Sequence, residues 1–179
     1  MQLQTLYQQT IKFATAKHVE QGQQVPGTNL PYVVHLSNVA MEVMIAGFNT
    51  ENFNTGFAVQ VALLHDTLED TATTFVELEN KFGSDIAIAV SALTKSAIVP
   101  KEQRMSDCLA RIKKLQPEVW AVKLADRITN LQPPPQDWDK IKKAKYREEA
   151  RLILNELKAG NGFLANRLQD KIEAYGVYL

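Results

Sequence analysis

Residues 63–71, LLHDTLEDT, place one histidine and three carboxylates directly after an apolar run, FAVQVALL. In a helix each residue advances by about 100°, so His65, Asp66, Glu69 and Asp70 are neighbours at i, i+3 or i, i+4 spacing and can face one volume. Three carboxylates there repel one another, and burial would raise their pKa values. A divalent cation removes that repulsion, so this stretch predicts a metal site.

One helix cannot complete a coordination sphere, so further ligands must come from elsewhere in the chain. His35 enters an apolar helix in LPYVVHLSNVA, and Asp126 is an acid within an apolar turn of helix, VKLADRITNL. Two imidazoles with two carboxylates suit Mn, Fe, Co or Zn better than an all-oxygen Ca site. Such an ion lowers the pKa of water and so supplies a nucleophile near neutral pH.

The same residues also have a structural interpretation. A buried histidine is commonly a satisfied core residue, and carboxylates at a helix end are commonly solvated. Asp126 has Lys123 and Arg127 close by in the sequence as ion-pair partners. His18 lies on the apolar stripe of the first helix, and we expect it to be structural. Spacing alone leaves the metal site and the structural interpretation both open.

Composition restricts the class of protein. The chain has 179 residues, 45% of them hydrophobic, which fits one domain with a sizeable core. Twenty basic and twenty acidic residues balance, so no global charge favours nucleic acid or a membrane as partner. The single cysteine, Cys108, excludes an internal disulfide, and the N-terminal residues lack the pattern of a signal peptide. These features predict a cytoplasmic protein.

Helical periodicity extends along almost the whole chain, and no segment alternates convincingly with the period of a strand. Three prolines at 133–135 interrupt the pattern and are the one plausible boundary. We expect a single all-α domain over residues 1–179, a bundle of about eight to ten helices. The expected helices are 3–18, 35–47, 55–68, 75–82, 84–93, 101–115, 118–131, 138–158 and 162–175, with Thr74 and Gly83 bounding the fourth and Gly47 ending the second.

The order His35, His65-Asp66, Asp126 resembles the HD superfamily of metal-dependent phosphohydrolases. Longer strings, ALLHDTLEDT, KFGSDIAIAVSALTK and VKLADRITNL, resemble the hydrolase domain of the RelA/SpoT family and its small stand-alone hydrolases. The similarity covers most of residues 10–155. It implies an HD-type helical domain that hydrolyses the 3′-pyrophosphate of (p)ppGpp, releasing GDP or GTP and pyrophosphate, with Mn²⁺ as the metal.

The resemblance also implies metal ligands, a pair of carboxylates that position and activate the attacking water, and two nucleotide contacts. The implied ligands are His35, His65, Asp66 and Asp126, the pair is Glu69 and Asp70, and the contacts are Asn130 and Tyr146. The spacing agrees with these roles, because Asn130 follows Asp126 by one helical turn. Lys101 and Arg104, also one turn apart, could contact substrate phosphates, although a solvated helix face is the better explanation for either residue taken singly.

The chain departs from the family pattern in the loop before His35. Where the family has a basic pair, in strings similar to GQRRKDGTPY, this chain has Gln24 and Val25 in a slightly longer loop. The proline usual after the first histidine is replaced by Leu36. Losing a basic pair that stacks on or cradles guanine weakens base recognition. We therefore expect Gln24 to lie in a substrate site whose base specificity differs from that of the family.

Two other functions remain open at this point. The altered loop favours an HD phosphohydrolase that acts on another phosphorylated nucleotide, for example one with a ribose phosphate such as NADPH. A protein that binds a nucleotide without turnover is the second alternative. The sequence does not determine the oligomeric state, and a homodimer is one option.

Overall fold

The fold is entirely helical over residues 2–179, the part of the chain that the computed structural model describes. Its α-helices are α1 (Leu3–Glu20), α2 (Val33–Phe48), α3 (Thr55–Leu64), α4 (Thr67–Asp70), α5 (Phe75–Phe82), α6 (Ser84–Leu93), α7 (Arg104–Ile112), α8 (Pro117–Asn130), α9 (Lys140–Leu157) and α10 (Gly162–Ala174). Short 3₁₀ helices η1 (Lys101–Gln103), η2 (Lys158–Gly160) and η3 (Tyr175–Tyr178) accompany them. The predicted all-α class and the number of helices are confirmed.

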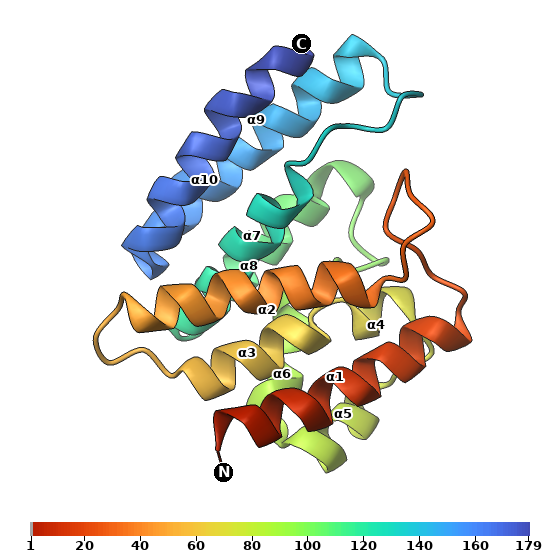
Figure 1. The fold of residues 1–179 in the computed structure, drawn as a ribbon, viewed down its shortest axis with the longest axis vertical. Coiled ribbons are helices and arrows are strands. Elements are labelled where there is room, and N and C mark those ends of the chain that lie inside the picture. Colours follow the sequence, from red (N-terminus) through yellow and green to blue (C-terminus); the bar gives the residue numbers. More distant parts are fainter. Residues whose placement is uncertain (1) are drawn as a thin grey trace.

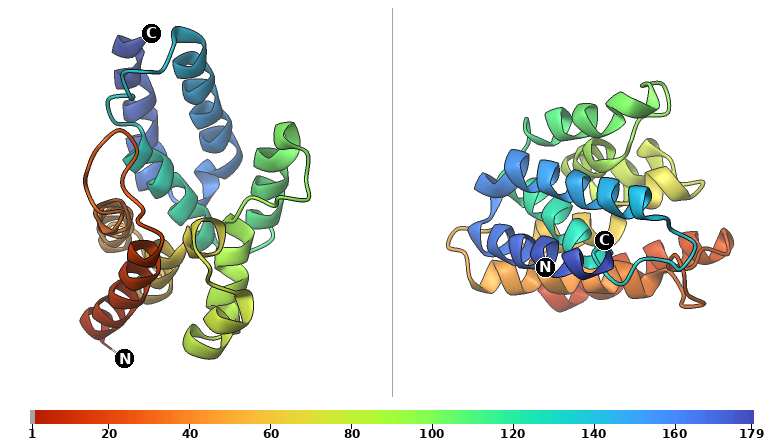
Figure 2. Two further views of the ribbon diagram at one scale, coloured as in Figure 1. Left: turned by 90° about the vertical axis from the view of Figure 1, so that its right-hand side faces the viewer. Right: turned by 90° about the horizontal axis from the view of Figure 1, so that it is seen from above.

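The helices surround two central members, α3 and α8. Along α8 every residue from Ala121 to Thr129 is buried, and so are the last four residues of α3. Figures 1 and 2 show α9 and α10 side by side at one end of the molecule, with α1 and α5 at the other. Buried apolar side chains from Ala14 to Tyr175 form one cluster. None of the helices within residues 2–179 is long and apolar enough to cross a membrane.

The expected continuous helix over residues 55–68 is interrupted, and that prediction is wrong in a way that matters for the site. α3 ends at Leu64, and α4 begins only at Thr67. Between them, Asp66 has φ −100° and ψ −2°, in the sparsely populated bridge region of backbone space. Consecutive residues on a regular helix point about 100° apart. Here the break brings the side chains of His65 and Asp66 to within 2.9 Å of each other.

Side chains near the break satisfy carbonyl groups that a terminating helix leaves without partners. Nδ1 of His65 donates to the carbonyl oxygen of Ala62 at 2.8 Å. The hydroxyl of Thr67 donates to the carbonyl of Leu64 at 2.7 Å. The end of α3 is therefore stable although it is buried, and the first of these bonds also orients the imidazole of His65.

Two predicted helix boundaries illustrate local rules. Thr74 caps α5, because its hydroxyl accepts a hydrogen bond from the backbone N–H of Glu77 at 3.2 Å. Gly47 does not end α2, which continues to Phe48. Its role is close packing, since a Cβ at this position would lie 2.3 Å from the hydroxyl oxygen of Thr55. The glycine thus lets the end of α2 meet the start of α3.

An ion pair between a buried carboxylate and an exposed guanidinium attaches the C-terminal helix to α2. Both Glu42 carboxylate oxygens accept from Arg167, at 2.5 and 2.6 Å, and Glu42 is only 4% exposed. Asn161 also donates to Thr50 at 2.9 Å. α10 therefore packs on the same core as the helix that carries His35. A single domain over residues 1–179 stays a prediction, which these contacts support.

We predict that Arg167→Ala lowers the free energy of unfolding by about 1–3 kcal/mol, because it leaves the buried Glu42 carboxylate without its partner. Urea unfolding followed by circular dichroism measures the change. Replacing both partners, in Glu42→Met/Arg167→Leu, should recover much of the loss, since no buried charge then remains. An Arg167→Ala variant as stable as the parent would contradict the assigned role of this ion pair.

Candidate active site

Three side chains from three helices meet at the centre of the molecule. His35 lies in the first turn of α2, His65 follows the last residue of α3, and Asp126 lies near the end of α8. All three are buried. The Nε2 atoms of His35 and His65 are 3.4 Å apart. Oδ1 of Asp126 lies 3.5 Å from Nε2 of His35 and 3.6 Å from Nε2 of His65. Residues separated by up to 91 positions in the sequence thus direct ligand atoms to one point.

These separations fit a bound transition metal. Ligand atoms about 2.1 Å from a common ion and at tetrahedral angles lie about 3.4 Å apart. The carbonyl of Ala62 only accepts hydrogen bonds, so Nδ1 of His65 carries the proton of the neutral ring and Nε2 is left to bind metal. His35, His65 and Asp126 can therefore hold one metal ion.

Asp66 lies beside this group of three. Its Oδ2 is 2.9 Å from Nε2 of His65 and 3.7 Å from Nε2 of His35. The hydroxyl of Tyr32 donates to the same oxygen at 2.5 Å. The ring of Tyr32 also packs 5.1 Å from that of His35 between centroids. Tyr32 therefore orients one carboxylate and supports one imidazole of the cluster.

Asp126 is held from both sides. The ammonium of Lys123 lies 2.9 Å from Oδ2, and the amide of Asn130 donates to Oδ1 at 2.5 Å. Burial by itself would raise the pKa of Asp126, but the buried charge of Lys123 holds this pKa well below its usual value. The same pairing raises the pKa of Lys123 against the effect of its own burial. Asp126 is thus an anion with Oδ1 turned toward the two histidines.

The carboxylates around His65 make its imidazole more basic than an ordinary histidine. Burial alone would lower its pKa, but the carboxylates of Asp66 and Asp126 raise it to about 10. The pKa of Asp66 is correspondingly lowered, despite burial, chiefly by His65. A protonated imidazole cannot bind a metal ion, so binding at Nε2 displaces this proton.

The remaining carboxylates of the LLHDTLEDT stretch hydrogen-bond to groups outside the three-residue cluster. Oε2 of Glu69 accepts from the backbone N–H of Lys95 at 2.9 Å, and the Lys95 ammonium lies 3.5 Å from Oε1. Oδ2 of Asp70 accepts from the amide of Gln23 at 2.9 Å. Both residues are exposed. The four side chains that the sequence places together are thus separated. His65 and Asp66 lie at the cluster, and Glu69 and Asp70 lie along its edge.

A cavity of about 990 Å³ opens beside the cluster, bounded by residues 25–30, the start of α2, residues 132–138 and the end of α8. Among the predicted site residues, His35, Asn130 and Tyr146 line it. Trp138 and Tyr175 add aromatic surface, and the ring centroid of Tyr146 lies 5.0 Å from that of Trp138. Behind Tyr146, the guanidinium of Arg127 stacks 4.4 Å from its ring centroid.

Three predicted substrate contacts do not line this cavity. Gln24 forms a backbone bridge with Pro31, and its neighbour Val25 lines the cavity instead. The guanidinium of Arg104 donates to the carbonyls of Val99 and Ala97 at 2.9 and 3.2 Å. Lys101 is exposed in η1. Arg104 thus supports its own loop.

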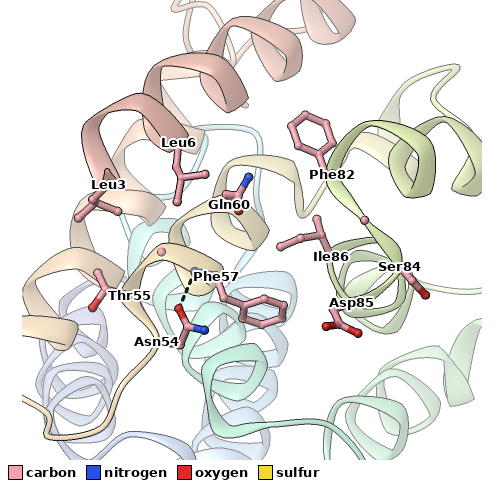
Figure 3. A pocket seen from close by; sticks show the side chains of 12 residues that line it. Leu3, Leu6, Asn54, Thr55, Phe57, Gln60, Phe82, Ser84, Asp85 and Ile86 are labelled. Carbon is pink, nitrogen blue, oxygen red and sulfur yellow. Dashed lines mark hydrogen bonds between the residues drawn. The ribbon is translucent and has the colours of Figure 1, made fainter. Parts of the chain in front are cut away.

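A second cavity, of about 630 Å³, is lined by residues of α1, the start of α3 and the junction of α5 with α6. Figure 3 shows Leu3, Leu6, Phe57, Phe82 and Ile86 around it. It contains none of the predicted site residues, and its one ionisable side chain is Asp85. Of these two cavities, only the first is lined by predicted site residues, namely His35, Asn130 and Tyr146.

Sequence reasoning missed several supporting residues at the site. Gln23 and Tyr32 match the Gly-Gln and Pro-Tyr of the family string, but their contacts carry no local signal, because their partners Asp70 and Asp66 lie 47 and 34 positions away. Tyr175, in η3, lines the cavity from the C-terminal segment. The sequence indicates Lys123 only as an ion-pair partner of Asp126. Its i, i+3 spacing to that acid was the one available local signal.

Comparisons with known proteins agree with this arrangement. A family model described as HD domain matches residues 11–162. A relative from Danio rerio, named guanosine-3′,5′-bis(diphosphate) 3′-pyrophosphohydrolase MESH1, is 34% identical over 96% of this chain and 94% of its own. The human protein of the same name is 31% identical, with 92% of each chain covered. A solved structure described as a metazoan ortholog of SpoT that hydrolyzes ppGpp superimposes with a TM-score of 0.80 at 26% identity, covering 96% of both chains.

We predict that a saturating divalent transition metal stabilises the parent protein and fails to stabilise Asp126→Asn or His65→Ala. Binding at about 100 times the dissociation constant adds about 2.7 kcal/mol. Thermal unfolding with and without Mn²⁺ measures this, and metal analysis after gel filtration measures occupancy. Asp85→Asn, an exposed acid at the second cavity, is the control and should behave as the parent. Full metal occupancy in Asp126→Asn would refute the ligand assignment.

Proposed function

The chain belongs to the HD-domain family, and from that premise we propose that it is a metal-dependent phosphohydrolase that removes the 3′-pyrophosphate of guanosine polyphosphates. With water as nucleophile, ppGpp gives GDP and pyrophosphate, and pppGpp gives GTP and pyrophosphate. The observation that carries the proposal is the convergence of His35, His65 and Asp126, at separations of 3.4 to 3.6 Å, beside a cavity of nucleotide size. The names of the similar proteins support the same reaction.

Mn²⁺ is the proposed metal, held by His35, His65, Asp66 and Asp126. When bound, the ion lowers the pKa of water and neutralises charge on the phosphate oxygens. Asp66 is included because its Oδ2 lies within 3.7 Å of both imidazole nitrogens and is oriented by Tyr32. The ligand set of two imidazoles and two carboxylates suits a transition metal of this kind.

Glu69 and Asp70 are proposed to take up the proton of the attacking water and to orient that water. Both are carboxylates at the edge of the cluster, and each accepts a hydrogen bond from a separate element, Lys95 or Gln23. A carboxylate held in this way keeps its lone pairs directed, which general-base catalysis needs. Asn130, whose amide already bonds Asp126, lines the cavity and can contact the ribose or a phosphate.

The nucleoside is proposed to lie against Tyr146 and Trp138, where a planar base can stack. No lysine or arginine lines this cavity within the described residues, and Val25 occupies the loop position where the family's pattern is basic. The ammonium of Lys142 does stack on Trp138, 4.3 Å from the ring centroid. The departure of this loop from the family pattern motivates one alternative substrate, another nucleotide with a ribose phosphate, such as NADPH.

A nucleotide panel decides between the two substrates. We expect the Mn²⁺-loaded protein to release pyrophosphate from ppGpp and pppGpp, with GDP and GTP as the second products. Chromatography of the nucleotides and separate assays for phosphate and pyrophosphate identify each reaction. Phosphate release from NADPH, with both guanosine polyphosphates left intact, would establish the alternative and reject the leading proposal.

We predict that Glu69→Gln keeps its metal but loses turnover by about 10²-fold or more, because the amide cannot accept a proton. Steady-state kinetics together with metal analysis separate the two effects. Glu77→Gln, an acid of α5 that pairs with Lys17, is the matched control and should keep the parental rate. Parental turnover in Glu69→Gln would show that the carboxylate plays no part in proton transfer.

A further inference from the structure

His18 has an environment that core packing alone does not explain. It is 1% exposed near the end of α1, and its ring stacks on Tyr32 with centroids 4.7 Å apart and planes inclined by 29°. Its Nδ1 lies 2.5 Å from Oε1 of Gln23, while Nε2 is buried without a hydrogen-bond partner among the described residues. Leaving a buried polar atom unpaired costs about 1–3 kcal/mol, so an apolar ring would serve packing better.

The partners determine the direction of every hydrogen bond in this group. Nε2 of Gln23 donates to Oδ2 of Asp70 at 2.9 Å, because a carboxylate only accepts. The amide oxygen of Gln23 therefore faces His18, and Nδ1 of His18 must donate to it. Burial lowers the pKa of His18, which keeps the imidazole neutral. A neutral ring with its proton on Nδ1 has a bare Nε2, in agreement with the unpaired atom.

Gln23 also connects two parts of the site through its backbone. Its backbone N–H donates to the backbone carbonyl of His18 at 3.1 Å, and its backbone carbonyl accepts from the backbone N–H of Tyr32 at 3.3 Å. The next residues enter the loop whose members Val25 and Leu30 line the cavity. A single residue thus joins the end of α1, the cavity loop and the edge carboxylate Asp70.

We propose that His18 and Gln23 are positioning residues for hydrolysis, with His18 fixing the amide orientation of Gln23 and Gln23 fixing the carboxylate of Asp70. The inference rests on the proposed function, in which Asp70 acts on the attacking water. Neither residue is among those that line the cavity. Loss of supporting hydrogen bonds of this kind lowers activity by about 10- to 100-fold in metal sites.

The kinetic test compares variants that remove the hydrogen bonds joining His18, Gln23 and Asp70 with one variant that keeps an N–H donor at position 18. Gln23→Leu and His18→Phe preserve approximate size and remove the hydrogen bonds, whereas His18→Asn keeps an N–H near the Nδ1 position. We expect kcat to fall about 10- to 100-fold in the first two, with KM and metal content close to parental values. His18→Asn should recover part of kcat. The double variant His18→Phe/Gln23→Leu should be no slower than Gln23→Leu, because both changes break one chain of bonds.

Nitrogen NMR gives a readout that does not depend on activity. In ¹⁵N-labelled protein we expect His18 to be neutral with its proton on Nδ1, and Gln23→Leu to abolish this preference. The opposite tautomer in the parent would overturn the proposed bond direction. An active parent whose Gln23→Leu variant keeps parental kcat overturns the positioning role alone. A parent inactive on every nucleotide overturns the proposed function, and the role of these residues with it.

Discussion

Burial of several ionisable side chains at one point is the constraint on which the rest of the structure depends. His35, His65 and Asp126 lie within hydrogen-bonding or ligand distance of one another in the middle of a helical core. Charged groups are tolerated there only when each is paired or bound to metal. Lys123 supplies that pairing to Asp126, and His65 supplies it to Asp66. The arrangement is therefore stable as a protein structure and retains the geometry of a metal site.

The break between α3 and α4 makes this arrangement possible. On a regular helix the side chains of His65 and Asp66 would point about 100° apart. Ending the helix at Leu64 turns both inward, and the side chains of His65 and Thr67 satisfy the carbonyls left free. The same bond that caps the helix selects the tautomer with Nε2 available. Local helix termination and metal-site chemistry are thus one feature of the molecule.

Support for the site extends outward through hydrogen bonds and stacked rings. Tyr32 bonds Asp66 and packs between His18 and His35. On the cavity side, Tyr146 lies among Arg127, Trp138 and Tyr175, the last of them beyond the residues that the family model matches. The C-terminal helices therefore do more than cover the core. They bring an aromatic wall to a cavity whose other wall is the loop before α2.

The sequence by itself determined the all-α class, most helix boundaries and the identity of the converging residues. Helical periodicity is a local property, and the order of histidines and acids is visible along the chain. Only the tertiary structure decided that His65 and Asp66 lie at the cluster while the other two acids of LLHDTLEDT bond to Lys95 and Gln23. The backbone break at His65-Asp66 has no local sequence signal. The tertiary structure also decided that Val25, and not Gln24, faces the cavity, and that Gln23 reaches Asp70. Such contacts join segments far apart in sequence, and only packing in three dimensions sets them.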